Sequence, residues 1–435
     1  MVRSLGRREI HLGPAFALAG RHKLGVILGL GAAFRIAQYL ADRSLWLDEG
    51  SLRGNIARMT WRGLTGPLAG TQLAPPGFIA VEWATLRMLG DSRLALRLVP
   101  LIGGLASLWL FAEVARRCLR PLGVLIAAAM FAVSDDLIYF ASELKQYSTD
   151  VAAGLACLLS GVVAAGRPPS ARERLGATAL GAAVVWFSHP SAFVLAGVGS
   201  VLLASAAARR DWRDLGLRAL TCLAWAASFA TVYSVSASQL GHRRDMWAFW
   251  AFAFPPSPPI TVANLAWWLR RASYLFVNPL NFATPLGTTA SALPPLAFAL
   301  VGCASMARRR PSALGMIALP GLFAAAAASL HLYPFHGRLL LFLVPMLLLM
   351  IAEGAESVAR AIGGRASWAV VVGSLLLFPT LLAGYRLVDP RDRGDFNPRG
   401  DLRPASLDPD DWPCRRTPPV GVVPGKVEAR PGVSG

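Results

Sequence analysis

Long apolar runs follow one another along most of the chain, and most of them are close to the roughly 20 residues that a helix needs to cross a membrane. Short polar segments, many of them rich in arginine, separate the runs. The runs lack the period-2 alternation of a membrane barrel. Because lipid offers no partner to open backbone groups, helices are the element that fits. The pattern predicts about 11 spans, at residues 24–41, 94–115, 121–140, 148–165, 175–188, 190–208, 215–237, 290–306, 312–330, 338–353 and 367–386.

Composition supports a membrane protein. Of 435 residues, 54% are hydrophobic and 16% are charged, whereas a soluble domain has roughly a quarter of its residues charged. This balance excludes a disordered chain, a disulfide scaffold and an ordinary soluble enzyme. The net charge of +18 would suggest a nucleic-acid partner in a soluble protein. Here the arginines lie in short clusters between apolar runs, so we expect membrane lipids as partners and no nucleic acid.

The arginine clusters also predict orientation, because cytoplasmic loops carry an excess of Lys and Arg. If all the clusters face the cytoplasm, the spans between them alternate consistently. We therefore expect a multi-pass protein of the cell membrane with its N-terminus in the cytoplasm and its C-terminus outside. A cleaved signal peptide is the alternative for residues 1–41, although no small-x-small cleavage site follows it. The clusters lie at 3–23, 116–120, 167–174, 209–213, 308–310 and 360–365.

The same orientation fixes the loops on the outer side. Counting 76–90 as a crossing would put the cluster at 116–120 outside, so we predict that 50–63 and 76–90 are helices along the outer interface. The larger outer loops are then 42–93 and 238–289. Residues 1–387 form one transmembrane domain, and residues 388–435, rich in Pro, Arg and Asp, form a poorly ordered outer tail.

An acidic pair, Asp48 and Glu49, directly follows the first span. One interpretation is a helix cap, because carboxylates are favourable at a helix N-terminus. The other is a partly desolvated pair beside Trp46 and Leu47, in which one pKa is raised and a carboxylate serves as general base.

A second polar segment lies where the third span ends and the fourth begins. It contains Glu143, Lys145, Gln146 and Tyr147. A polar turn is one interpretation. The variety of hydrogen-bonding groups beside aromatic residues slightly favours a binding site.

A third candidate is Arg338, which opens a very apolar helix on the outer side, where the positive-inside rule disfavours arginine. Its guanidinium could extend to the interface, or bind an anion such as phosphate together with the helix N-terminus. His336 is a weaker candidate. Gln72 precedes the prolines Pro75 and Pro76, whose role we interpret as structural.

In order along the chain, these pieces resemble the GT-C superfamily of membrane glycosyltransferases. Within it, they are most similar to bacterial relatives of protein O-mannosyltransferases and of the lipid A aminoarabinose transferase. The resemblance rests on the acidic pair, the segment 75–105, an SExxxY segment at 142–147, and Gly337-Arg338. Two departures stand out. Many relatives carry a basic residue just before the proline pair, where this chain has Gln72, and an arginine in the segment where it has Lys145 and Gln146.

The resemblance implies an all-α, GT-C-like fold and transfer of a sugar from a polyprenyl-phosphate donor to a lipid, glycan or protein acceptor at the outer face. It implies a base, for which Asp48 and Glu49 are candidates, and groups that bind the phosphate or the sugar. Those candidates are Glu143, Lys145, Gln146, Tyr147, His336 and Arg338.

Inverting single displacement is the simplest mechanism for such a transfer. Nothing in the sequence requires a cofactor, although members of the family differ in their use of divalent metals. The aromatic outer loop, with Trp247, Trp250, Trp267, Trp268 and Tyr274, could cover the site or form an interfacial belt. A transporter or flippase of polyprenyl-linked sugars and a non-catalytic scaffold remain alternatives. Charges at the outer ends of the spans and the absence of an internal repeat disfavour the transporter.

Overall fold

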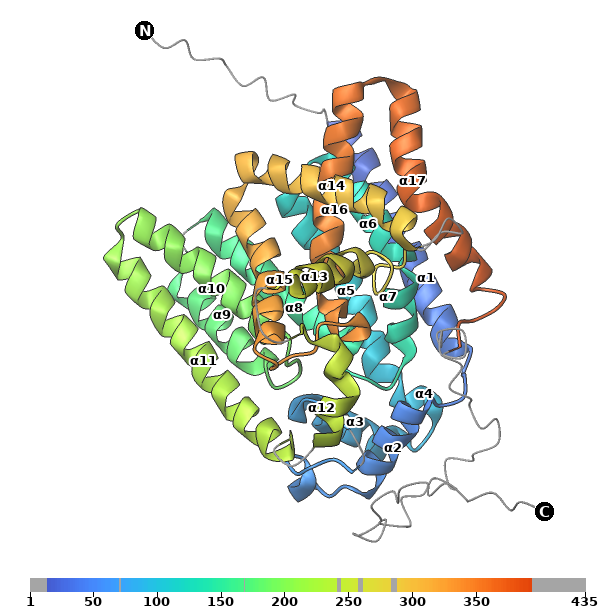
Figure 1. The fold of residues 1–435 in the computed structure, drawn as a ribbon, viewed down its shortest axis with the longest axis vertical. Helices are drawn as coiled ribbons and strands as arrows, with labels where there is room; N and C mark the ends of the chain where they lie inside the picture. The colour runs from blue at the N-terminus through green and yellow to red at the C-terminus, as the bar shows by residue number, and fades with distance from the viewer. Residues whose placement is uncertain are drawn as a thin grey trace, which may run out of the picture. The chain divides into compact units, whose positions relative to one another are not determined.

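The computed structural model describes residues 14–69, 72–167, 169–240, 244–256, 261–282 and 288–392. All regular structure in these ranges is helical, which confirms the all-α prediction (Figure 1). The elements are α1 (Pro14–Leu40), α2 (Leu47–Arg58), η1 (Trp61–Gly63), α3 (Pro76–Leu89), α4 (Arg93–Leu96), α5 (Leu98–Cys118), α6 (Pro121–Val133), α7 (Asp135–Tyr139), η2 (Phe140–Ser142), α8 (Tyr147–Gly166), α9 (Ala171–Val184), α10 (Ser191–Ala208), α11 (Trp212–Leu240), α12 (Arg244–Trp250), η3 (Ala251–Ala253), α13 (Val262–Leu275), α14 (Thr288–Arg309), α15 (Pro311–Ser329), η4 (Gly337–Leu343), α16 (Val344–Ile362) and α17 (Gly364–Tyr385).

Within the described residues, nine helices are long and apolar enough to cross a membrane, and a bent pair makes a possible tenth. The predicted count of about 11 is reduced at two places. The run at 121–140 is bent by 56° between α6 and α7, where Ser134 is extended ahead of Asp135 and Asp136. The run at 175–188 overlaps α9, whose 14 residues extend only about 21 Å. Proline disfavours helical geometry in the preceding residue, and Pro190 follows His189 soon after α9 ends.

The centre of the bundle is the segment of η4 and α16, whose most apolar window is 89% buried. Helix α14 packs on α16 through glycines. A Cβ on Gly302 would lie 1.9 Å from the carbonyl oxygen of Met350, and one on Gly354 would lie 1.8 Å from that of Phe298. Small residues let membrane helices approach this closely, and the contact is then made by backbone atoms. Any larger side chain at either glycine would separate the two helices.

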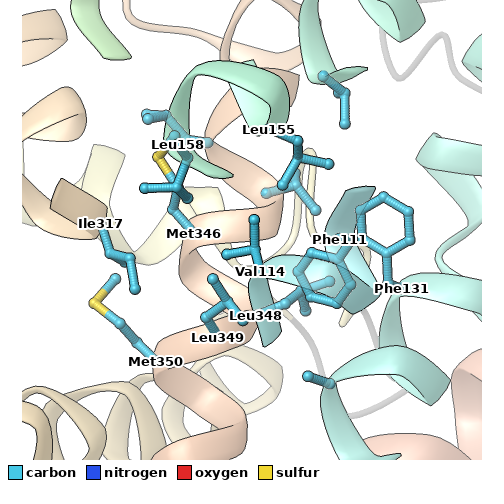
Figure 2. Packing of buried hydrophobic residues seen from close by; sticks show 14 of the residues in the cluster. Phe111, Val114, Phe131, Leu155, Leu158, Ile317, Met346, Leu348, Leu349 and Met350 are labelled. Atoms are coloured by element: carbon cyan, nitrogen blue, oxygen red, sulfur yellow. The ribbon is translucent and has the colours of Figure 1, made fainter. Parts of the chain in front are cut away.

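Close-packed apolar side chains fill the space around α16 (Figure 2). Phe111 of α5 stacks on Phe131 of α6, with ring centroids 4.3 Å apart. Leu158 of α8 and Leu349 of α16 belong to the same buried cluster. This packing fixes the relative positions of α5, α6, α8 and α16, and therefore of the polar residues at their ends.

The short helices α2, α3 and α4 lie together at one end of the bundle (Figure 1). The predicted interfacial helices at 50–63 and 76–90 correspond to α2 and α3. Leu52 and Ile56 of α2 are fully buried against Phe78 and Ile79 of α3. This local core supports the first turn of α2, which carries the acidic pair.

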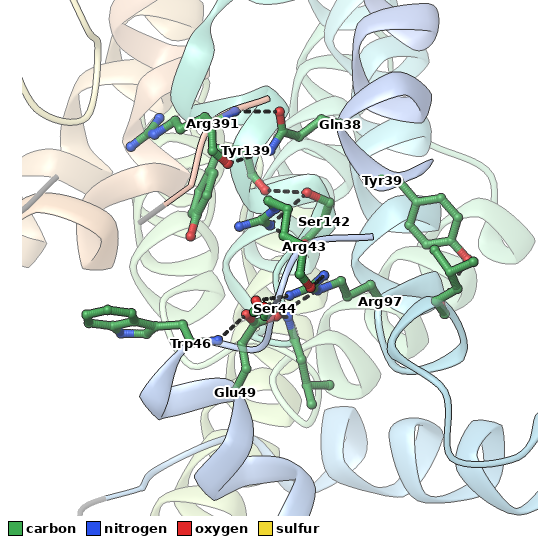
Figure 3. Close-up of polar contacts among 12 residues, drawn as sticks. Gln38, Tyr39, Arg43, Ser44, Trp46, Glu49, Arg97, Tyr139, Ser142 and Arg391 are labelled. Carbon is green, nitrogen blue, oxygen red and sulfur yellow. Dashed lines mark hydrogen bonds and ion pairs between the residues drawn. The ribbon is translucent and has the colours of Figure 1, made fainter. Parts of the chain in front are cut away.

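The described chain ends in an anchored segment. Arg391 is buried, and its guanidinium donates to Asp135 at 2.5 Å and to Asp136 at 2.6 Å. The amide side chain of Gln38 in α1 hydrogen-bonds both backbone groups of Arg391 (Figure 3). Most of the tail predicted at 388–435 lies outside the described residues, so its order remains a prediction.

Candidate functional site

Asp48 and Arg338 meet in the folded chain although they are 290 residues apart. The Nη2 atom of Arg338 lies 2.7 Å from Oδ2 of Asp48, and the two side chains are 19% and 28% exposed. Burial raises the pKa of Asp48. Attraction to Arg338 and Lys145, with hydrogen bonds from Arg338 and Gln72, outweighs burial and holds the pKa below its usual value. Asp48 is therefore an ionised, partly accessible carboxylate.

Glu49 points away from this ion pair, because consecutive helical residues diverge by about 100°. It is fully buried and forms two 2.9 Å hydrogen bonds with Arg97 (Figure 3). Its two carboxylate oxygens also accept from the backbone N–H groups of Leu144 at 2.8 Å and Trp46 at 3.0 Å. Both oxygens are occupied, so Glu49 is suited to joining α2, Arg97 and the 143–146 turn.

Glu143 is fully buried. Burial and the nearby carboxylate of Glu49 raise its pKa to about 7, against the opposing attraction of Arg338 and Arg43. Arg43 is fixed beside it, because its Nη2 atom donates to the carbonyl oxygen of Ser142 at 2.6 Å (Figure 3). The guanidinium of Arg43 also lies over the ring of Tyr139, 4.4 Å from the centroid.

Lys145 is buried and donates to the Oε1 atom of Gln72. Burial lowers the pKa of Lys145, although Asp48 opposes this shift. Gln72 also hydrogen-bonds Asp48 and so connects the ammonium to the carboxylate. Gln146 does not join this chain of hydrogen bonds. Its Oε1 atom has no hydrogen-bond partner among the described residues, and its backbone carbonyl oxygen accepts from the hydroxyl of Thr149 in the first turn of α8.

Tyr147 is buried under Arg338, whose guanidinium lies 5.5 Å from the centre of the ring. The Nη1 atom of Arg338 is buried and has no hydrogen-bond partner in the described part of the chain. One face of the guanidinium is thus held by the ring and one nitrogen by Asp48, while the buried Nη1 atom has no partner among the described residues.

The apolar helix predicted to open at Arg338 is present, but its first part is not α-helical. Gly337 and Arg338 begin a seven-residue 3₁₀ helix, η4, and α16 starts only at Val344. Gly337 has a φ of +47°, a left-handed conformation that glycine adopts without strain. This turn, rather than a helix dipole, directs Arg338 toward Asp48.

His336 does not join the cluster of charges around Asp48. Its Nδ1 atom lies 2.7 Å from Nη1 of Arg271, and its ring stacks on Tyr274 with centroids 5.5 Å apart. Trp250 and Phe252 also pack near the His336 ring. The aromatic loop predicted to cover the site therefore lies beside residue 336, two positions from Arg338.

Three residues of the site were missed by the sequence analysis: Arg43, Gln72 as a hydrogen-bonding group, and Arg97. The sequence did contain a feature that could have selected Arg43 and Arg97. Each stands at the outer end of a predicted span, which is the reason Arg338 was selected. In total, four cations (Arg43, Arg97, Lys145 and Arg338) face three carboxylates (Asp48, Glu49 and Glu143).

The carboxylates of the site are bound to arginines. The described residues contain no group of three or more His, Cys, Asp or Glu side chains able to hold one. Asp48 is bound by Arg338 and Glu49 by Arg97, so a metal would have to displace arginines. No step proposed below uses a metal.

The arrangement of these helices is similar to that of several solved structures. The structure of ArnT from Cupriavidus metallidurans bound to undecaprenyl phosphate matches with a TM-score of 0.54 and 14% identity, over 85% of this chain and 66% of ArnT. The Archaeoglobus fulgidus oligosaccharyltransferase in complex with Zn and sulfate matches with a TM-score of 0.52 and 14% identity, over 83% of this chain and 53% of that one. The archaeal oligosaccharyltransferase AglB from the same organism, in complex with an inhibitory peptide and a dolichol-phosphate, matches with a TM-score of 0.51 and 13% identity, over 86% of this chain and 56% of AglB.

The fold that the resemblance implied is therefore confirmed. This chain spans between about half and two thirds of the length of these proteins. No family model matches the sequence, and no curated protein is detectably similar to it.

Proposed function

We propose that the protein is a membrane glycosyltransferase that moves a sugar from a polyprenyl-phosphate carrier to an acceptor at the outer face of the membrane. The observation that carries this proposal is the 2.7 Å pair of Asp48 and Arg338, partly exposed, with one guanidinium nitrogen unpartnered. Such a transfer requires a base and a phosphate-binding cation that lie close to each other.

In the proposed step, an acceptor hydroxyl oxygen attacks the anomeric carbon of the donor. A new C–O bond forms while the bond from that carbon to the phosphate oxygen breaks, and its electron pair leaves on the phosphate. Asp48 accepts the proton of the hydroxyl. Attack from the face opposite the phosphate inverts the configuration at the sugar.

The departing phosphate needs a group that holds its growing charge, and no general acid, because phosphate is already a weak base. Arg338 is suited to this role through its unpartnered nitrogen. Lys145 is the second candidate, because Gln72 holds its ammonium near Asp48. This lysine could supply the positive charge that many relatives carry just before the proline pair.

Glu49 and Glu143 have different proposed roles. Glu49 positions the first turn of α2 through Arg97 and does not contact substrate. Glu143, with a pKa raised to about 7, adjusts the charge of the cluster and could bind sugar hydroxyls. The dolichol-phosphate and the undecaprenyl phosphate in the neighbouring structures support a lipid-carried donor.

The test is to incubate purified protein with a panel of polyprenyl-phosphate sugars and an extract of cell-envelope acceptors. We expect one donor to lose its sugar, with free polyprenyl phosphate and a glycosylated acceptor as products. The Asp48→Asn variant should form both products at least about 100-fold more slowly. Movement of intact donor across a vesicle membrane without release of sugar would instead favour the transporter.

A further inference from the structure

An apolar cavity of about 370 Å³ lies among α8, α9, α10 and α11, with α5 behind it. Its walls are made of side chains such as Leu159, Ala164, Leu202 and Trp225. Val163 and Leu180 at its rim are 37% and 36% exposed, so the cavity reaches the surface of the bundle. Its volume lies in the range of small-molecule sites.

One end of this cavity is cationic. Arg167, Arg174 and Arg218 line it, together with Glu173, which pairs with Arg167. Asp214, adjacent to this end, binds Arg174 at 3.3 Å and Arg218 at 2.7 Å. The surrounding sequence, residues 166–218, contains seven arginines and three carboxylates, which leaves a net positive charge around the mouth.

The cavity is remote from the site at Asp48. Helix α8 begins with Tyr147 under Arg338 and ends with Gly166 beside Arg167. Its 20 residues separate the two places by about 30 Å, the thickness of the hydrocarbon core. The arginines therefore lie at the membrane face opposite the proposed active site, where the positive-inside rule predicts the cytoplasm.

We propose that this cavity binds one anionic phospholipid of the cytoplasmic leaflet. An acyl chain fills the apolar part, since most of the side chains that line the cavity are apolar. The phosphodiester headgroup lies against Arg167 and Arg174, as in basic pockets between transmembrane helices that bind anionic lipids. Charge complementarity selects this occupant over a zwitterionic lipid, and the site is independent of the proposed sugar transfer.

Native mass spectrometry of the purified full chain, with equimolar phosphatidylglycerol and phosphatidylcholine of identical acyl chains, tests the proposal. We expect wild-type protein to retain phosphatidylglycerol preferentially. Each arginine near an anionic surface favours binding about fivefold, so Arg167→Gln should lower the preference about fivefold, and the double variant with Arg174→Gln more. Ala164→Trp, which fills the cavity, should reduce retention of both lipids.

Two matched variants serve as controls. Arg308→Gln changes an exposed arginine of another predicted cytoplasmic cluster, outside the cavity, and should leave the lipid preference unchanged. Ala165→Trp adds the same bulk at an exposed neighbour that does not line the cavity. Equal retention of the two lipids by wild-type protein would overturn the proposal. So would equal effects of the variants at 164 and 165, or retention of a polyprenyl phosphate in place of the phospholipid.

Discussion

Replacing Asp48 with asparagine removes the charge of one carboxylate and little else. Asparagine has nearly the same shape, and its amide oxygen can still accept a hydrogen bond from Arg338. The first turn of α2 keeps its cap, because Glu49 and not Asp48 accepts from the N–H group of Trp46. The variant therefore tests the proton-accepting role separately from the structure of the helix.

We expect sugar transfer by Asp48→Asn to fall about 10²- to 10⁴-fold, the usual contribution of a positioned general base. The loss of stability should be far smaller. The ion pair with Arg338 is neither fully buried nor fully exposed, so its disruption should cost about 1–2 kcal/mol, between the values for exposed and buried pairs. A loss of this size leaves purified protein folded in the assay.

The assay follows the release of radiolabelled sugar from a polyprenyl-phosphate donor, together with donor binding and thermal unfolding in detergent. Donor binding should be retained or become tighter, because Arg338 no longer shares its charge with a carboxylate. The matched control is Asp91→Asn, since Asp91 forms a comparable 2.8 Å pair with Arg53 away from the site. The reasoning is refuted if Asp48→Asn keeps more than a tenth of the wild-type activity, or if Asp91→Asn loses as much.

Four further predictions concern single residues. Arg338→Ala should weaken donor binding more than acceptor binding, as measured by separate titrations, and an equal loss of both would contradict its phosphate role. The donor KM should rise as pH increases through about 7, because ionisation of Glu143 reduces the excess positive charge, and Glu143→Gln should flatten this profile. Glu82 is fully buried and its carboxylate oxygens have no hydrogen-bond partner among the described residues, so burial raises its pKa to about 9. Because the folded state then holds a proton that the unfolded chain releases, stability should fall as pH rises from about 4.5 to about 9. Glu82→Gln should remove this slope in thermal unfolding, and an unchanged slope would assign it to other groups. Gly302→Val should lower the free energy of unfolding by about 3 kcal/mol or more, because the added side chain overpacks the contact between α14 and α16. Gly373→Val should have a much smaller effect, because no atom lies within 4 Å of a Cβ at that position. Similar losses of stability for the two variants would show that helix propensity, and not packing, dominates.

The contacts of the glycines and the pairings within the charged cluster both depend on the tertiary structure. Nothing in the sequence around Gly302 or Gly354 distinguishes these glycines from others, yet each meets backbone atoms of the facing helix. Arg97 and Glu49 are 48 residues apart, and their pairing depends on how α5 packs against its neighbours. Contacts of this kind are invisible in a periodic pattern, because periodicity reports only which face of a helix is apolar.

The sequence alone determined the class of the protein and the side chains that need an explanation. Hydropathy was sufficient to predict that the chain is helical, since helices pair all their backbone polar groups internally within a membrane. The cost of charge near lipid was sufficient to select Asp48, Glu49, the 143–147 segment and Arg338.

Only the tertiary structure decided which of these residues meet. It separated Asp48 from its neighbour Glu49, placed Arg338 on a 3₁₀ turn beside Asp48, and left His336 with Arg271. It also divided the run at 121–140 at Ser134 and anchored Arg391 to the acidic residues that follow. The physical reason is that helix directions and register arise from packing between segments distant in the chain, and adjacent residues on a helix point to different partners.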